Sequence, residues 1–516
     1  MIRTLLISLL LLSLSSCAQL NPQSKKTTEK FFPDFDNVIN TPAFAKKKGF
    51  TSHEEMMSFL NSLVSKHPQL ATLTSIGQSQ EGKDIPMIVL NNTASTQTKT
   101  RVFMQGGLHG NEPASTESML YLLDQLLSDE KCKSLLDNIT LGMIPMANID
   151  GYEKQDRYAA NGLDLNRDQT KLLAPETVCL KKAFNAFEAE VAIDFHEYKP
   201  YRVDFTRMST YGIAGIYDVM FLYSGNLNVP ESLRKYTYDA FISPLEKVMD
   251  EHSLRHHDYF SSREHDGHTH FHQGSSNARS SATSFALRNT ISALIEVRGV
   301  GLNRTSFTRR VMTGYLVALS VLESAAAEGD EIKRILAAAD REMHEAVVNS
   351  RSEISDSKIQ VIDLDTNEEI TFDVILHDAL KSTATLSRSR PMGYVLLPGH
   401  AELVEKLNAL GFKLTELSQP STFTVENYTI TSYDEEQEKY EGTHRQNVGT
   451  EIKKLSKEFP AGSQVLLMDQ PRSNLAIEII EPEATNSFVS FGLLKVESGT
   501  ELPIYRLQSE FIQDRP

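Results

Sequence analysis

The amino-acid sequence predicts an α/β protein, with an open, mostly parallel (mixed) and twisted sheet flanked by helices, followed by a smaller β-rich α+β domain. Apolar runs of the buried-strand type alternate with helical patterns over roughly the first 330 residues. Several of these runs are followed by chemically reactive residues, at the strand ends where open α/β sheets carry their sites. Beyond about residue 350 the pattern changes to short strands and turns. A chain of 516 residues with 40% apolar composition is long enough for two domains.

The N-terminus resembles the signal of an exported bacterial lipoprotein. Arg3 precedes an apolar run from Leu5 to Leu14, which is too short to span a bilayer and suits the middle of a secretory signal. The run ends in Leu14-Ser15-Ser16-Cys17, which is similar to a lipobox, so we expect a lipid on Cys17; an unmodified cysteine in an ordinary signal peptide is the alternative. Residues 1–17 are then the signal and 18–40 a polar tether. Ala18 favours the outer membrane, on its periplasmic or surface side.

Residues 41–330 are predicted to form the larger domain, and its first elements have clear local signals. Ser52 and Glu55 have the spacing of a capping box at the start of an amphipathic helix. Arg101–Gln105 is predicted to be a strand, and a helix is expected to begin at Pro113 after a glycine turn.

Two later strands place reactive side chains. The apolar runs 191–195 and 293–297 are predicted to be buried strands, which puts His196 and Glu296 at or near strand ends. A helical pattern over 307–325 closes the domain.

The remaining chain is predicted to contain a connecting helix over 331–350 and a β-rich domain over 351–516. Apolar residues at helical spacing support the connecting helix: Ile332, Leu336, Ala339, Met343 and Val347. Within the domain we expect a hairpin of 359–364 and 370–376, a strand, helix and strand over 394–414, and short strands at 465–468 and 475–480. No catalytic motif is visible there.

Charge and cysteine content exclude one partner class and leave one question open. The chain has 52 Lys and Arg against 68 Asp and Glu, a net charge of −16, which excludes nucleic acid as its main partner because phosphate backbones require clustered positive charge. Beyond Cys17 only Cys132 and Cys179 remain, and in an oxidising compartment they either pair or stay as two buried thiols.

Four short patches occur in one order along the chain. They are His109-Gly-Asn-Glu112, Asp164-Leu-Asn166-Arg167, Asp194-Phe-His196 and Leu294-Ile-Glu296-Val-Arg298. Each patch alone is weak in a chain with 15 histidines, but the ordered set resembles the zinc carboxypeptidases of the carboxypeptidase A/B kind, also called funnelins. The resemblance covers roughly residues 45 to 325. It implies hydrolysis of peptides at a free C-terminus.

The resemblance assigns roles to the patches. His109, Glu112 and His196 would bind one Zn²⁺, since two histidines and a glutamate form a known ligand set that leaves a position open. Glu296 would be the general base, which requires a carboxylate close to the metal but not bound to it. The structural alternatives are a core histidine at His196 and, at Glu296, a buried carboxylate paired with Arg298.

Three polar residues would bind the substrate or its transition state. Arg157, nine residues before Asn166, matches the position from which many relatives stabilise the oxyanion of the tetrahedral intermediate. Asn166 and Arg167 would hold the terminal carboxylate, with charge-assisted hydrogen bonds from the arginine. Surface arginines in a loop are the alternative.

One departure from the family leaves the side-chain preference open. The family commonly has a substrate-binding Tyr some twenty residues before the catalytic Glu, but no Tyr lies between Tyr259 and Tyr315. The segment before Glu296 is instead rich in histidine: His252, His256, His257, His265, His268, His270 and His272. We expect most of them to lie in a solvated loop; alternatively, some line the cleft, replace the phenol or bind a second metal. Arg279 is a further candidate substrate contact.

Two other functions remain as alternatives. One is a zinc amidohydrolase that acts on murein peptides or N-acyl amino acids, because the same four zinc-site and base residues would serve it. The other is a catalytically inactive binding lipoprotein, against which the complete set of ligands, base and clamp argues. The sequence contains neither a His-Glu-x-x-His helix nor a Gly-x-Ser-x-Gly elbow.

Overall fold

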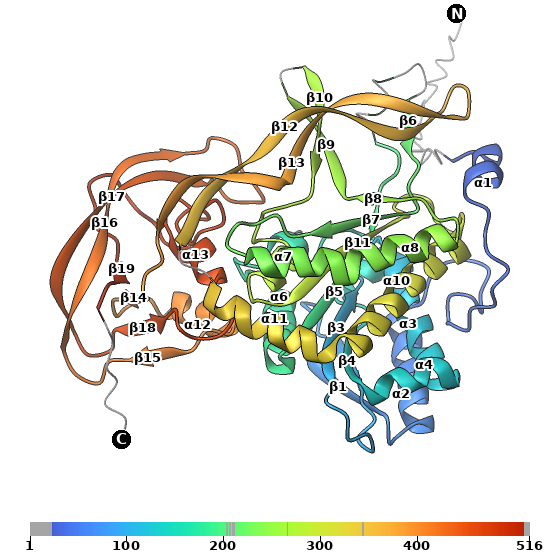
Figure 1. Ribbon diagram of the computed structural model, residues 1–516, viewed down its shortest axis with the longest axis horizontal. Coiled ribbons are helices and arrows are strands. Elements are labelled where there is room, and N and C mark those ends of the chain that lie inside the picture. Colours follow the sequence, from blue (N-terminus) through green and yellow to red (C-terminus); the bar gives the residue numbers. More distant parts are fainter. Residues whose placement is uncertain are drawn as a thin grey trace, which may run out of the picture.

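The computed structural model describes residues 23–202, 205, 208, 212–265, 267–342 and 345–509. The predicted signal and Cys17 lie outside these residues. The centre of the molecule is an eight-stranded sheet in the order β1-β2-β4-β3-β5-β11-β7-β8 (Figure 1). Its strands are β1 (Ala71–Gln78), β2 (Asp84–Leu90), β3 (Thr100–Gly106), β4 (Ile139–Ile144), β5 (Val191–Tyr198), β7 (Val219–Tyr223), β8 (His256–Asp258) and β11 (Ile291–Arg298).

The sheet has a parallel centre. Strand β3 pairs in parallel with β4 and β5, and β5 with β11, whereas β1–β2, β2–β4 and β7–β11 are antiparallel. The helices around it are α2 (His53–Lys66), α3 (Pro113–Ser128), α4 (Glu130–Ser134), α5 (Ile149–Lys154), α6 (Pro175–Phe187), α7 (Glu231–Thr237), α8 (Ser243–Glu251), α9 (Ser281–Ala286), α10 (Phe307–Ala327) and α11 (Gly329–Glu342). This mixed sheet flanked by helices confirms the predicted fold class.

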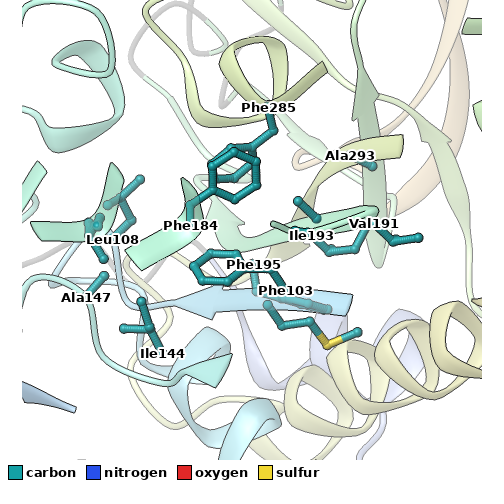
Figure 2. Packing of buried hydrophobic residues seen from close by; sticks show 14 of the residues in the cluster. Phe103, Leu108, Ile144, Ala147, Phe184, Val191, Ile193, Phe195, Phe285 and Ala293 are labelled. Carbon is teal, nitrogen blue, oxygen red and sulfur yellow. The ribbon is translucent and has the colours of Figure 1, made fainter. Parts of the chain in front are cut away.

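Helices cover both faces of the sheet. On one face of β3, the ring of Phe103 contacts Phe184 of α6 and Phe285 of α9, as Figure 2 shows. Gly106 has the opposite parity along the strand, and a Cβ there would point at Ser115 and Met119 of α3. Therefore α3 lies on the other face, where it packs against α10.

The parallel strands bring distant residues to one edge. Gly106, the last residue of β3, pairs with Phe195 of β5, and the next residue along β5, His196, pairs with Glu296 of β11. The carboxyl ends of these three strands therefore meet where the sequence patterns place the reactive side chains.

A second sheet of five strands joins the two halves of the chain. Its order is β6-β12-β13-β10-β9, and its long hairpin runs past the large sheet toward the C-terminal region (Figure 1). The strands are β6 (Ile213–Gly215), β9 (Phe260–His265), β10 (His268–Gln273), β12 (Glu345–Asp363) and β13 (Glu368–Ser389). The predicted hairpin is therefore present and longer than expected. Since it pairs with earlier strands, the domain division near residue 351 stays a prediction.

The C-terminal region forms a six-stranded antiparallel sheet in the order β15-β18-β14-β19-β16-β17. Its elements are β14 (Gly393–Leu396), α12 (Ala401–Ala409), β15 (Leu414–Glu416), β16 (Ser421–Glu435), β17 (Gln446–Phe459), β18 (Gln464–Leu467), α13 (Leu475–Ile480) and β19 (Ile504–Leu507). One hydrophobic core extends from the large sheet into this region and includes Leu403, Ile477 and Ile504.

Four expectations about local structure were wrong or incomplete. Residues 475–480 are the helix α13, because all six are buried and so apolar spacing could not separate a helix from a strand. The connecting helix ends at Glu342, and Val347 lies in β12, where pairing with Ser387 of β13 replaces the helical pattern.

The histidine-rich segment 252–272, expected to be mostly a loop, is also largely β-structure. It forms β8 and the antiparallel pair β9–β10. His268, His270 and His272 alternate along β10, and His272 lines the main cleft. His270 Nδ1 lies 2.8 Å from His377 Nε2 of β13. Within the part of the chain that the structure describes, these histidines do not form a second metal-ligand group.

The described part of the predicted tether is docked on the protein. Helix α1 (Lys25–Phe31) has Ser24 as its N-cap, and Phe31 and Phe32 are buried. Gln23 accepts a hydrogen bond from Arg298, so the chain is held in place from this residue on.

Cys132 and Cys179 are both free, the first buried in α4 and the second half-buried in α6. Among the described residues no single helix is long and apolar enough to cross a membrane; α10 and α11 meet that criterion only as a pair bent by 84°.

Candidate active site

The turn between β3 and α3 presents the first two predicted metal ligands. His109 and Glu112 are 2% and 1% exposed, and Pro113 starts α3 directly after them. Gly110 between them is required by close packing, because a Cβ there would lie 2.1 Å from the carbonyl carbon of Gly151 in α5. The local sequence therefore fixes where these two side chains point.

His196 of β5 completes a compact group with them. Its Nδ1 lies 2.9 Å from Glu112 Oε2 and 3.0 Å from His109 Nδ1, and His109 Nδ1 lies 2.8 Å from Glu112 Oε1. Two imidazole nitrogens and a carboxylate thus converge on one point in a buried place.

A second carboxylate lies behind each histidine. His109 Nε2 is 3.0 Å from Asp164 Oδ1, and His196 Nε2 is 2.8 Å from Asp194 Oδ2. An ionised carboxylate only accepts hydrogen bonds, and Glu112 flanks both Nδ1 atoms just as the aspartates flank Nε2. A metal ion bound at the Nδ1 atoms would leave the proton of each histidine on Nε2, where it is donated to the aspartate. The sequence analysis missed both aspartates, although they open two of the four patches.

The electrostatics of the group favour a cation. Burial alone would raise the pKa of Glu112, but His109 and His196 lower it. Burial alone would lower the pKa of His196, but Asp194 and Glu112 raise it well above its ordinary value. A site that stabilises positive charge on His196 also stabilises a bound metal ion.

The residues fit a zinc ion. Their ligand atoms all lie within 4.8 Å of one another, and theirs is the single group of this kind among the residues that the structure describes. Two histidines and one glutamate match the donor preference of Zn²⁺ in hydrolytic sites. Thus the structure brings together the three ligands that the sequence analysis selected.

Glu296 lies beside this group without belonging to it. Its Oε2 is buried and has no hydrogen-bond partner among the described residues. Burial raises the pKa of Glu296, and repulsion from Glu112 adds to the effect, whereas a nearby cation would lower it. The predicted alternative, a pair with Arg298, is wrong, because Arg298 donates to Gly215 and Gln23.

Arg157 faces the same group from a loop. Its Nε and Nη2 donate to Asp164 Oδ2 at 3.0 and 2.8 Å, and its Nη1 lies 3.6 Å from Glu112 Oε1. Burial opposes the charge, but Asp164 and Glu112 raise the pKa of Arg157. One carboxylate, Asp164, therefore positions both a metal ligand and a cation.

Asn166 and Arg167 lie in a short turn, Leu165–Arg167, whose N-cap is Asp164. Asn166 Oδ1 accepts a hydrogen bond from the Ser281 backbone N–H, which fixes the amide so that its NH₂ group can donate elsewhere. Arg167 donates from Nη1 to the Asn166 carbonyl, and its side chain is 34% exposed. Both residues line the cleft.

Arg279 also lines the cleft, and the C-terminal region reaches it there. Its Nε donates to Glu441 Oε1 at 2.8 Å, and its Nη2 contacts the hydroxyl of Tyr440. Both partners lie in the loop between β16 and β17, and Glu441 has a positive φ of 51°. The sequence analysis missed them, because no local motif links residue 440 to a site some 160 residues earlier.

These side chains share one large cleft. Its volume is about 1060 Å³, and it is lined from the large sheet, the strands β9 and β10, and the C-terminal region. The lining includes His109, Arg157, Arg167, Tyr259, Arg279, Glu296 and Tyr440. The cleft is large enough for several residues of a peptide.

Comparison with solved structures gives partial superpositions. A carboxypeptidase A from Helicoverpa armigera aligns over 56% of this chain and 78% of its own, with a TM-score of 0.43 and 18% identity. A metallo-carboxypeptidase from Burkholderia cenocepacia aligns over 53% and 69%, with a TM-score of 0.41 and 19% identity.

Comparison of sequences gives matches that extend over most of the chain. The family model for zinc carboxypeptidase matches residues 56–294. Carboxypeptidase 2 of Trichophyton rubrum is 30% identical over 504 residues, which is 92% of each chain, and its counterpart from Trichophyton equinum is 29% identical over 502 residues. With this match and a buried His-Glu-His group that can bind the metal, the chain belongs to the zinc carboxypeptidase family and is a zinc metallopeptidase.

Proposed function

We propose that this metallocarboxypeptidase hydrolyses the last peptide bond of its substrate with Glu296 as general base, Arg157 as oxyanion-stabilising group and Asn166 with Arg167 as carboxylate clamp. The observation that carries the proposal is the buried, unpartnered Glu296 oxygen in the cleft beside the His-Glu-His group. Zinc held by His109, Glu112 and His196 would polarise the scissile carbonyl and acidify a water molecule.

Glu296 would move the protons. As a carboxylate it takes a proton from the attacking water, and it then gives this proton to the nitrogen of the leaving residue. Glu296 lies on β11, a buried central strand, which keeps its carboxylate in one position while the peptide bond is hydrolysed. Its freedom from partners leaves both carboxylate oxygens available for the transfer.

Arg157 would stabilise the charge that develops on the carbonyl oxygen. Asp164 holds two of its nitrogens, so the third, Nη1, is preorganised toward the metal group. A fixed donor of this kind typically contributes about 3 to 4 kcal/mol to transition-state stabilisation.

The clamp would make the enzyme an exopeptidase. A terminal carboxylate can accept from the Asn166 amide and from the partly exposed Arg167 guanidinium. An internal peptide unit lacks this charge, so it would forgo the charge-assisted hydrogen bonds that Arg167 offers at the end of the cleft.

Replacing Glu296 by Gln tests the assignment. The E296Q protein should bind zinc as the wild type does, yet its kcat on a blocked dipeptide should fall by at least about a thousandfold, because the amide cannot accept the proton. Zinc content is measured by atomic emission and release of the C-terminal residue by mass spectrometry. A variant that holds zinc and keeps full activity would refute the role of Glu296.

We also propose that the protein is exported and attached through a lipid on Cys17 to the cell envelope, at the periplasmic or outer face of an outer membrane. The apolar run from Leu5 to Leu14 and the lipobox-like sequence support this. Cys17 precedes the docked Gln23 by six residues, so a lipid on Cys17 would hold Gln23 within about 20 Å of the membrane.

Labelling of cells with a fatty-acid probe tests the anchor. The wild type should incorporate the probe and fractionate with membranes, whereas Cys17→Ser should do neither. Equal labelling of the two proteins would exclude lipid attachment at Cys17.

A further inference from the structure

Three cations of the catalytic region surround one carboxylate of the C-terminal region. Glu441 Oε1 lies 2.8 Å from Arg279 Nε and 3.7 Å from Arg167 Nε, and Glu441 Oε2 lies 2.9 Å from Lys171 Nζ. The cations outnumber the carboxylate, so this end of the cleft keeps a net positive charge.

Two of these cations are buried in place. Lys171 is 2% exposed, and its ammonium group contacts only the Glu441 carboxylate and the ring of Phe491 among the described residues. Arg279 is 10% exposed and is held by Glu441 and Tyr440. Since buried charges need partners, Glu441 explains why the loop between β16 and β17 reaches into the cleft.

Arg279 keeps donor capacity after these contacts. Glu441 and Tyr440 use its Nε and Nη2, and its Nη1 has no bond to another described residue. The guanidinium lines the cleft and flanks Glu441 together with Arg167. A bound substrate whose terminal carboxylate rests on Arg167 would therefore bring its last side chain near Arg279.

The charged side chains that line the whole cleft are also mainly positive. Among the residues that the structure describes, six arginines line it: Arg157, Arg167, Arg202, Arg263, Arg279 and Arg445. The described lining includes three acidic residues, and one of them, Glu197, is already paired with Arg310 at 2.5 Å. In a chain with a net charge of −16, this positive lining is local to the site.

We propose that Arg279 determines specificity by binding the side-chain carboxylate of an acidic C-terminal residue. The inference rests on the proposed clamp, because it requires Arg167 to hold the main-chain carboxylate. A substrate ending in Glu has two carboxylates for the two arginines. A C-terminal Lys would meet like charges, and an apolar residue would leave Arg279 unused.

The test compares peptides that differ only in the last residue, which is Glu, Gln, Leu or Lys. The zinc-loaded full chain should cleave the Glu peptide with a kcat/KM at least about tenfold above that of the Gln peptide, the range expected for a charged hydrogen bond. In Arg279→Gln this ratio should fall to about one, while kcat/KM on the Leu peptide stays within about threefold. Arg279→Lys, which keeps the charge and guards against a folding defect, should retain part of the preference.

Arg445→Gln is the matched control, because it removes a positive charge from the same cleft at a residue that stacks on Tyr440 and pairs with Glu436. It should keep the Glu to Gln ratio within about twofold. A wild-type ratio near one, or an equal loss on all peptides in Arg279→Gln, would overturn the proposal while the carboxypeptidase mechanism stands. Release of single residues that survives Glu296→Gln would instead overturn the mechanism.

Discussion

Each histidine of the His-Glu-His group contacts its own aspartate, and Asp164 makes more contacts than a single histidine requires. Its Oδ1 lies against His109 and accepts from the Asn166 backbone N–H, while its Oδ2 accepts from Arg157. Burial would raise the pKa of Asp164, but His109 and Arg157 hold it well below its ordinary value. The carboxylate is therefore ionised and orients a ligand, a cation and the clamp turn together.

Asp164→Asn should weaken zinc binding by about 10- to 100-fold, because an amide can offer only one acceptor oxygen to His109 and Arg157. Competition with a chromophoric chelator measures the affinity, and kcat on a blocked dipeptide should fall as well. Asp156→Asn, in the same loop but exposed, is the control and should bind zinc like the wild type. An unchanged zinc affinity in Asp164→Asn would show that His109 is oriented by other contacts.

Among secondary-structure elements, those with local signals could be predicted from the sequence. Ser52 and Glu55 form the expected capping box of α2, with both reciprocal hydrogen bonds. Pro113 begins α3, and the buried runs at β5 and β11 have the expected type and place. These signals depend on residues close in sequence, so they need no knowledge of the fold.

Elements defined by distant partners could not be predicted. Nothing in residues 475–480 distinguishes a buried helix from a strand, and the histidines of β10 become a strand by pairing with β9 and β13. The same holds for the site. The order of the four patches selects His109, Glu112, His196 and Glu296, whereas Tyr440 and Glu441 enter the cleft only through the packing of the C-terminal region.

The contact between the metal-binding turn and α5 gives a prediction at this scale. A Cβ at Gly110 would lie 2.1 Å from the carbonyl carbon of Gly151 and 2.2 Å from the backbone N of Tyr152, and backbone atoms cannot rotate away. Gly110→Ala should therefore displace His109, with a loss of about 1–3 kcal/mol in the free energy of unfolding and weaker zinc binding.

Gly329→Ala is the control for this substitution, since its new methyl group would meet only the Thr100 hydroxyl, at 3.1 Å. Chemical denaturation and chelator competition are measured on both variants. Equal stability and zinc affinity of Gly110→Ala and the wild type would contradict the close packing of the turn on α5.

At the scale of the whole molecule, the catalytic and C-terminal regions share buried polar contacts as well as a core. Arg288 donates to the carbonyls of Gly411 and Arg472, and Lys406 donates to the carbonyl of Lys171. Glu478 of α13 accepts hydrogen bonds from Asn226 and Asn228 of the catalytic region, at 2.7 and 2.8 Å. Such contacts favour joint unfolding of the two regions.

Glu478 makes this joint stability depend on pH. Burial raises its pKa to about 7, and the partners that oppose this shift are neutral amides. Between the ordinary carboxyl pKa and 7, the folded protein thus binds more protons than the unfolded chain, so the stability that Glu478 contributes is present at low pH and lost as pH rises through 7.

Glu478→Gln should unfold like the wild type near pH 4.5 but be more stable at pH 8, by up to about 3 kcal/mol. Urea denaturation at several pH values measures the difference, with the exposed Glu497→Gln as control. A difference that does not change with pH would mean that Glu478 is already ionised in the folded protein at pH 4.5, and that its contacts to Asn226 and Asn228 join the two regions in the charged form.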